Sequence, residues 1–153
     1  MNPPAEELTT EEVKKGVDVL REMRVVDLVF TGGNPLLRED IKEILKYSHE
    51  KFPLVTIYDN GSMAWRKLDV LRYVDRVCIS LSTLNPALQN LMCETPNAFE
   101  YALRSIELLK KKKIGVTVSI LISGLNLDEA PMMIEYFGKR RIPVVLSLYN
   151  DIS

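Results

Sequence analysis

The residues best suited to binding chemistry form the string Thr31-Gly32-Gly33-Asn34-Pro35, which follows the apolar run Val25–Phe30. Two glycines after a strand let the backbone approach a ligand closely and adopt a positive φ. A helix that begins just beyond such a turn would direct free N–H groups toward an anionic group. A Gly-Gly turn is also common in ordinary loops, so the string indicates a binding turn only when the rest of the chain agrees.

Further polar residues lie within, or directly after, later segments that have the composition of strands. Asp59-Asn60-Gly61 follows Leu54–Tyr58, Ser80 lies in Arg76–Leu81, and Ser119 lies in Val116–Ile122. The alternative for Asn60-Gly61 is a simple turn, and the alternative for the two serines is a satisfied strand hydroxyl.

Other site chemistries find little support in the chain. His49 is the only histidine, so a histidine-based metal site or a catalytic triad is disfavoured. Cys78 and Cys93 have no metal-type spacing, and their fifteen-residue separation is consistent with a buried small side chain and an incidental thiol. The chain also lacks a Gly-x-x-x-x-Gly-Lys-Ser/Thr loop and a Gly-x-Gly-x-x-Gly fingerprint.

The elements that must position these residues alternate between strands and helices. Strands are predicted at 25–30, 54–58, 76–81, 116–122 and 144–148, and helices at about 10–24, 38–51, 64–73, 99–112 and 127–140. This alternation predicts an α/β fold with a parallel sheet. The carboxyl ends of the strands would then bring residues 31–34, 59–61, 80–83 and 123–126 to one rim. The continuous apolarity of residues 25–30 predicts a strand covered on both faces.

Composition limits the class of protein. The 153 residues are 46% hydrophobic and 27% charged, with a net charge of −1. These values predict one folded domain and give no indication of nucleic-acid binding. No apolar run approaches the length of a membrane span, and the polar N-terminus is unlike a signal peptide. Two cysteines favour a reducing, cytoplasmic setting.

Taken together, the motifs resemble those of the radical S-adenosylmethionine (SAM) enzymes. The string Thr31–Arg38 follows a Leu-Thr-Thr-Glu-Glu helix start and an apolar strand, as in that family. Asp59-Asn60-Gly61 stands at the family's Thr-Asn-Gly turn, and Cys78–Ser82 is similar to its Ile-Ser-Leu-Asp segment. The segments 99–110, 116–119 and 125–129 continue the resemblance, which therefore spans nearly the whole chain.

The resemblance implies a partial (β/α) barrel that holds a [4Fe-4S] cluster and SAM at the carboxyl rim of its strands. Three cysteines of a Cys-x3-Cys-x2-Cys loop bind the cluster in that family, and electron transfer cleaves SAM to a 5′-deoxyadenosyl radical. By position, Thr31, Gly32 and Gly33 would present backbone groups to the methionine end of SAM. Asn34 replaces the usual Glu, so it can accept a hydrogen bond from the SAM ammonium but cannot form an ion pair.

Three further residues complete the cofactor site that the resemblance implies. Asp59 and Ser80 stand where polar residues approach the ribose or the methionyl group, and Ser119 stands where one reaches toward the carboxylate or ribose.

The chain also departs from the family pattern, since it has no cysteine triplet and Asn2-Pro3-Pro4 stands where the family continues from the third cysteine. We therefore expect residues 1–153 to be a single incomplete barrel domain of about five parallel βα units, without the first strand. The chain would be the SAM-binding fragment of a parent iron–sulfur enzyme, with no cluster and no activity by itself.

Two other functions remain open at this level. Without its first strand, the sheet would expose an edge at Val25–Phe30 or a neighbouring strand, and a non-catalytic binding or homo-oligomerisation module could use it. A phosphate-binding βα domain, with the Gly-Gly turn around the anion, is the third possibility. The sequence does not indicate a substrate.

Overall fold

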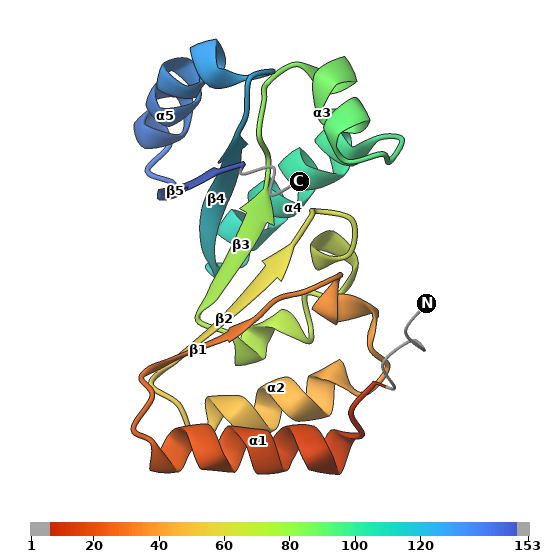
Figure 1. Cartoon of the computed structure of the whole chain (residues 1–153), viewed down its shortest axis with the longest axis vertical. Coiled ribbons are helices and arrows are strands. Elements are labelled where there is room, and N and C mark those ends of the chain that lie inside the picture. Colours follow the sequence, from red (N-terminus) through yellow and green to blue (C-terminus); the bar gives the residue numbers. More distant parts are fainter. Residues whose placement is uncertain (1–6, 150–153) are drawn as a thin grey trace.

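The computed structural model describes residues 7–149, and a single sheet runs through nearly all of this range (Figure 1). Its five strands are β1 (Asp27–Phe30), β2 (Leu54–Asp59), β3 (Arg76–Ser80), β4 (Gly115–Ile122) and β5 (Val144–Leu148). All neighbouring pairs are parallel, and the strand order in the sheet is β1-β2-β3-β4-β5. The sheet curls into a half-barrel, which confirms the predicted partial (β/α) barrel of five parallel units.

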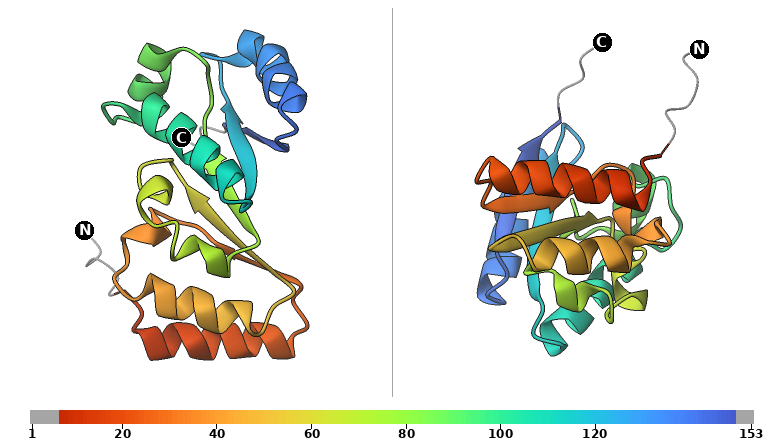
Figure 2. Two further views of the ribbon diagram at one scale, coloured as in Figure 1. Left: turned by 180° about the vertical axis from the view of Figure 1, so that it is seen from behind. Right: turned by 90° about the horizontal axis from the view of Figure 1, so that it is seen from below.

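In the described part of the chain, five α-helices connect or flank the strands. They are α1 (Thr10–Glu22), α2 (Ile41–His49), α3 (Pro86–Met92), α4 (Ala98–Lys111) and α5 (Ala130–Lys139), and short 3₁₀ turns occupy Pro35–Leu37, Ala64–Arg66, Leu71–Tyr73 and Leu127–Glu129. The view from behind shows α4 crossing the far side of the sheet, so the helices surround the outside of the curve (Figure 2). A capping box starts α1: the Thr9 hydroxyl accepts from the Glu12 N–H, and the Glu12 carboxylate accepts from the Thr9 N–H.

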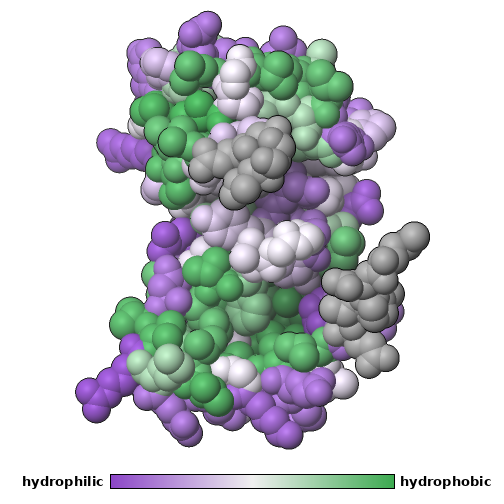
Figure 3. All heavy atoms as spheres, in the orientation of Figure 1, coloured by the Kyte–Doolittle hydropathy of each residue, from purple (hydrophilic) through white to green (hydrophobic). Residues whose placement is uncertain are grey.

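The hydrophobic core lies between the sheet and these helices. Alternate strand residues point toward it, for example Val55 and Ile57 on β2 and Val77 and Ile79 on β3, all with 0% exposure. Because neighbouring residues of a strand point to opposite faces, the residues between them line the concave face. That face is more polar, and the view onto it shows a narrow hydrophilic to neutral waist between two hydrophobic regions (Figure 3).

The structure corrects three local expectations. Residues 64–73 form two 3₁₀ turns instead of one helix, because the backbone leaves the helical region at Lys67, where φ is −118° and ψ is 35°. Residues 86–92, which lie outside the predicted helices, form α3, which starts at a proline and is capped by the Asn85 side chain. The strand β1 is covered on one face only: Val29 is 42% exposed because it lies on the open concave face.

The segment Asn2-Pro3-Pro4, which stands where the family continues from its third cysteine, lies outside the described residues. Within residues 7–149, no helix has the length and apolarity needed to cross a membrane.

Candidate functional site

The first part of the candidate site joins the ends of β1 and β2 through Asn34 and Asp59. Asn34 precedes the 3₁₀ turn Pro35–Leu37 and caps it, because its Oδ1 accepts from the Leu36 N–H at 3.1 Å. The Nδ2 of the same amide donates to Asp59 Oδ2 at 2.7 Å. Two residues that lie 25 positions apart in the sequence therefore form one unit at the carboxyl end of the sheet.

The Asp59 carboxylate is almost entirely enclosed, with 2% exposure. Its Oδ1 accepts from the backbone N–H groups of Gly61 at 2.7 Å and Ala64 at 3.3 Å. Burial raises the pKa of Asp59, and the hydrogen bonds from Asn34 and from the turn backbone oppose that rise. Asp59 therefore organises the turn after β2 from beneath, where a ligand on the surface would not touch it.

The Gly-Gly turn beside this pair is open to solvent. Thr31, Gly32 and Gly33 are all exposed, and Gly32 has a φ of 122°. An added Cβ at Gly32 or Gly33 would meet no atom within 4 Å, so the space above the turn is free. The turn thus provides accessible backbone polar groups next to the Asn34 amide.

The second part of the site lies on the concave face of the sheet. Ser80 at the end of β3 pairs in register with Ser119 of β4, and both side chains are half-buried. Asp59 belongs to the opposite face of the sheet, since side chains alternate along each strand. No hydrogen bond within residues 7–149 joins Asn34 or Asp59 to either serine, so the structure brings the predicted residues together as two separate pairs.

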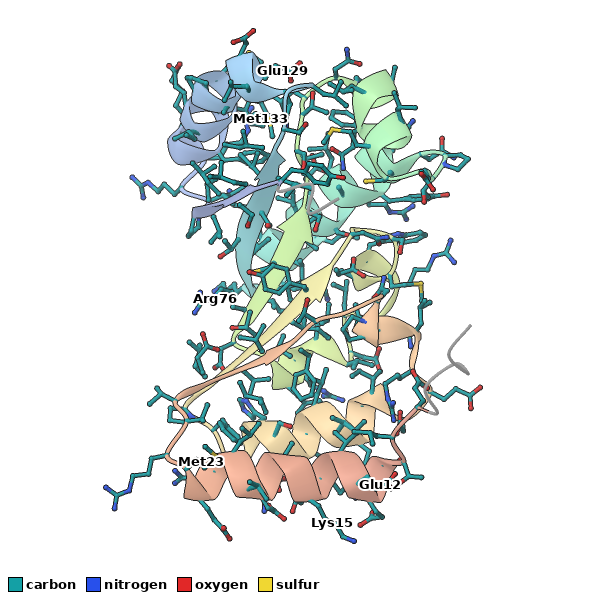
Figure 4. All side chains as sticks on the ribbon, viewed as in Figure 1. Glu12, Lys15, Met23, Arg76, Glu129 and Met133 are labelled. Carbon is teal, nitrogen blue, oxygen red and sulfur yellow. The ribbon has the colours of Figure 1, made fainter. Side chains whose placement is uncertain are left out.

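The concave face holds further polar residues that no sequence motif indicated. Tyr58 lies beside Cys78 in register, and Thr56 donates to Asp27 at 3.1 Å. Arg76, labelled at the start of β3 in Figure 4, lies 3.8 Å from the Asp27 carboxylate. The alternation of polar residues along residues 54–58 and 76–80 was the available signal for this face.

A buried polar network, also missed from the sequence, ties the ends of β3 and β4. The Asn126 amide is 2% exposed; its Nδ2 donates to the carbonyls of Ser82 at 2.7 Å and Leu121 at 2.8 Å, and its Oδ1 accepts from the Ser123 N–H at 2.8 Å. Nearby, Gln89 accepts from the Ser82 N–H at 2.9 Å. These bonds satisfy backbone groups that leave the sheet, and so fix the rim on this side.

A second contact extends that rim toward α5. Thr83 donates to the Glu129 carboxylate at 2.5 Å, and Glu129 lies at the start of α5 in Figure 4. Beside this region, an apolar cavity of about 450 Å³ is lined by the end of β4, by residues that follow β4 and β5, and by α3: Met92, Leu121, Ser123, Gly124, Leu125 and Tyr149.

The described residues do not fit an iron–sulfur cluster. Cys78 is buried in β3, Cys93 follows α3, and burial raises the pKa of both thiols, whereas cluster ligands are thiolates. Among residues 7–149, no group of three or more histidine, cysteine or acidic side chains is placed to hold a metal ion.

Comparison with known sequences places this chain in one protein family. The model of the Radical SAM superfamily matches residues 1–137. An AdoMet-dependent heme synthase of Methanosarcina barkeri is 32% identical over 129 residues, which cover 82% of this chain and 37% of the relative. A GTP 3′,8-cyclase of Aquifex aeolicus is 29% identical over 159 residues, which cover 99% of this chain and 49% of the relative. The chain thus spans less than half the length of these two curated relatives.

Solved structures share the fold at low sequence identity. Streptococcus suis SuiB superposes with a TM-score of 0.84 at 13% identity, covering 98% of this chain and 36% of SuiB. A structure of native anSMEcpe with bound AdoMet and the Kp18Cys peptide has a TM-score of 0.75 at 15% identity, covering 96% of this chain and 44% of that protein. These likenesses support the half-barrel architecture.

Proposed function

This chain belongs to the radical SAM superfamily, and we propose that its half-barrel is the SAM-binding part of an enzyme that generates a 5′-deoxyadenosyl radical. The observation that carries the proposal is the Asn34–Asp59 unit beside the open Gly32-Gly33 turn. Relatives and structure neighbours whose names include AdoMet support the choice of cofactor.

The methionine end of SAM has an ammonium and a carboxylate, and the first part of the site offers a group for each. Exposed backbone at Thr31, Gly32 and Gly33 suits the carboxylate, because N–H groups in an open glycine turn bind anions. The Asn34 Oδ1 suits the ammonium as a hydrogen-bond acceptor. Ser80 and Ser119 offer hydroxyls to the ribose from the concave face.

A reduced [4Fe-4S] cluster supplies the electron that cleaves SAM in this superfamily. The sequence contains two cysteines, Cys78 and Cys93, and neither is placed for such a cluster, so we assign no step of the reaction to it in this chain. The proposal is that this chain binds and orients SAM, while the cluster ligands come from residues outside it. Because the curated relatives have different activities in their names, no substrate is proposed.

A binding experiment tests this function. Ligand-observed NMR titration of the chain with SAM and with ATP should show SAM binding that ATP does not displace, and Asn34→Ala should weaken it. Glu135→Gln is the control, because it alters only an exposed ion pair with Lys139 on α5. Preference for ATP over SAM would instead favour the phosphate-binding alternative, and absence of SAM binding would refute the proposal.

A second candidate function, self-association through a sheet edge, rests on β5. Its side chains are largely exposed, with Leu146 at 47% and Leu148 at 74%, and β5 is an edge strand of the described sheet. Light scattering after size-exclusion chromatography should then show a dimer or larger species. A monodisperse monomer at high concentration would contradict this second function.

The free thiols of Cys78 and Cys93 fit a reducing compartment, and we propose the cytoplasm for either function.

A further inference from the structure

We propose that Asp59 is a positioning residue that fixes the orientation of the Asn34 amide, so that Asn34 presents its oxygen to a ligand ammonium. The inference rests on the proposed function, because the ammonium is that of SAM. It assigns Asp59 an indirect role, in place of the direct contact with the cofactor that the resemblance implied for this position.

The donor side of the Asn34 amide is committed to the turn after β2. Its Nδ2 lies 2.7 Å from Asp59 Oδ2, 3.2 Å from Ser62 Oγ and 3.4 Å from Asn60 Oδ1. An amide nitrogen has two hydrogens, and these acceptors suffice for both. The Oδ1 accepts one bond, from the Leu36 N–H, and keeps a second lone pair for a ligand.

Asp59 is the strongest of these acceptors and the least adaptable. Its contact with Asn34 is the shortest of the three, and Asp59 is only 2% exposed. The Oδ1 is held by the N–H groups of Gly61 and Ala64, so the Oδ2 is fixed toward Asn34. A carboxylate in this place can only accept, and therefore the amide of Asn34 must turn its NH2 group inward.

The substitution Asp59→Asn would reverse this constraint with almost no change in shape. The new Oδ1 would keep the bonds from Gly61 and Ala64, so the new NH2 group would face the NH2 group of Asn34. Two donors cannot pair, and the Asn34 amide would rotate to place its oxygen inward. Asn34 would then lose the Leu36 N–H bond and present a donor to the ammonium.

Exchanging the two side chains restores the pairing. In the double variant Asn34→Asp/Asp59→Asn, the amide at position 59 donates to the carboxylate at position 34, and the backbone bonds to both positions are kept. The acceptor oxygen again faces the ligand, and it now carries the charge. This variant should therefore bind an ammonium at least as tightly as the wild-type chain.

The test compares two probes, SAM and 5′-methylthioadenosine, which has the adenosyl group of SAM but no ammonium. Ligand-observed NMR gives dissociation constants for the wild-type chain, Asp59→Asn and the exchange variant, and circular dichroism checks that each is folded. We expect Asp59→Asn to lose about tenfold in SAM affinity, as for a hydrogen bond to a charged group, with its 5′-methylthioadenosine affinity unchanged. We expect the exchange variant to recover SAM binding.

Other outcomes overturn the inference in distinguishable ways. Equal loss of both probes in Asp59→Asn would show that Asp59 only maintains the turn. Unchanged SAM affinity, or failure of the folded exchange variant to recover binding, would refute the orienting role while leaving the proposed function intact. If Asp59→Asn does not fold, the SAM affinity of the exchange variant, compared with that of the wild-type chain, tests the orienting role by itself. A wild-type chain that binds neither probe would refute both this inference and the proposed function.

Discussion

The backbone of Gly61 lies against α4 so closely that a Cβ at Gly61 would be 2.5 Å from the Cα of Ala102. The same turn is bound to the helix by Ser105, whose hydroxyl donates to the Gly61 carbonyl at 2.8 Å and accepts from the Trp65 N–H at 3.2 Å. The turn that carries Asp59 is therefore held from one side by the strand β2 and from the other by α4.

This contact predicts that Gly61→Ala strongly destabilises the chain. The substitution adds a backbone clash to the strain of a φ of 90°, and we expect the free energy of unfolding to fall by about 3 kcal/mol. The matched control is Gly32→Ala, where the φ of 122° is also unfavourable but the added Cβ meets no atom. Urea denaturation should show a loss of about 1–2 kcal/mol for that variant. Equal losses for the two variants would contradict the close approach to α4.

Asn126→Asp should destabilise the rim at the ends of β3 and β4. The change replaces an NH2 group that donates to two carbonyls, those of Ser82 and Leu121, by a carboxylate oxygen that repels them. We expect a loss of about 3 kcal/mol in the free energy of unfolding at neutral pH, measured by urea denaturation.

The control is Asn85→Asp, which makes the same chemical change at a side chain that only accepts hydrogen bonds. The exposed Asn85 side chain caps α3 by accepting from the Ala87 and Leu88 N–H groups, and a carboxylate can accept the same bonds. The free energy of unfolding of the Asn85→Asp chain should therefore change by less than about 0.5 kcal/mol. A small effect at both sites would show that the Asn126 network contributes little.

Acid should weaken the connection between α1 and α2 through Asp40. The hydrogen bond from Arg38, together with one from Thr10, lowers the pKa of Asp40 from 3.8 to about 2. The unfolded chain therefore binds more protons between these two pH values, and this contribution to stability is present above pH 3.8 and is lost as the pH falls toward 2.

Asp40→Asn should consequently remove about 1 kcal/mol at neutral pH, since the pair is partly exposed, and flatten the pH dependence of unfolding below pH 4. The control Asp69→Asn breaks the exposed Lys42–Asp69 pair, 3.4 Å long, and should have almost no effect on stability. An unchanged acid limb in Asp40→Asn would contradict the assigned role.

Reconstitution of this chain with iron and sulfide should give no stable [4Fe-4S] absorbance. The two thiols lie in different elements and both have a raised pKa, so they would not provide a set of thiolate ligands. Optical and electron paramagnetic resonance spectra after desalting provide the measurement, with the Cys78→Ser and Cys93→Ser variants for comparison. A cluster retained in stoichiometric amount, and lost in either variant, would refute the prediction.

The positions of the strands in the sequence could be predicted because each is marked by its own apolar run. The predicted strand 144–148 has the observed bounds, and the other predicted strands differ by at most two residues at an end. Two helix expectations differ from the structure. Asn85 and Pro86 start α3 in a segment with few other helix signals, and the backbone of residues 64–73 breaks at Lys67, where no Gly or Pro marks the break.

The sequence allowed us to predict which residues lie at the candidate site, but not which of them contact one another. Position in the chain placed Asn34 and Asp59 at strand ends, yet their direct contact depends on how β1 and β2 align. Likewise, the concave-face contact of Arg76 with Asp27 joins strands that are not neighbours in the sheet. Pairings of this kind arise from the curl of the sheet, which the sequence does not state.

The agreement between strand order and chain order has a consequence for how the protein is made. Each strand from β2 onward pairs with the strand that precedes it in the sequence. No described strand is therefore inserted between two strands that come before it in the chain. During synthesis, every new βα unit that leaves the ribosome meets a finished edge on which to dock. Each strand pairing spans only the residues between two consecutive strands, from Thr56–Arg76 as the shortest pairing to Arg76–Gly115 as the longest. Stepwise growth also means that the growing edge is exposed at every stage, so the nascent chain is most vulnerable to aggregation at its newest strand.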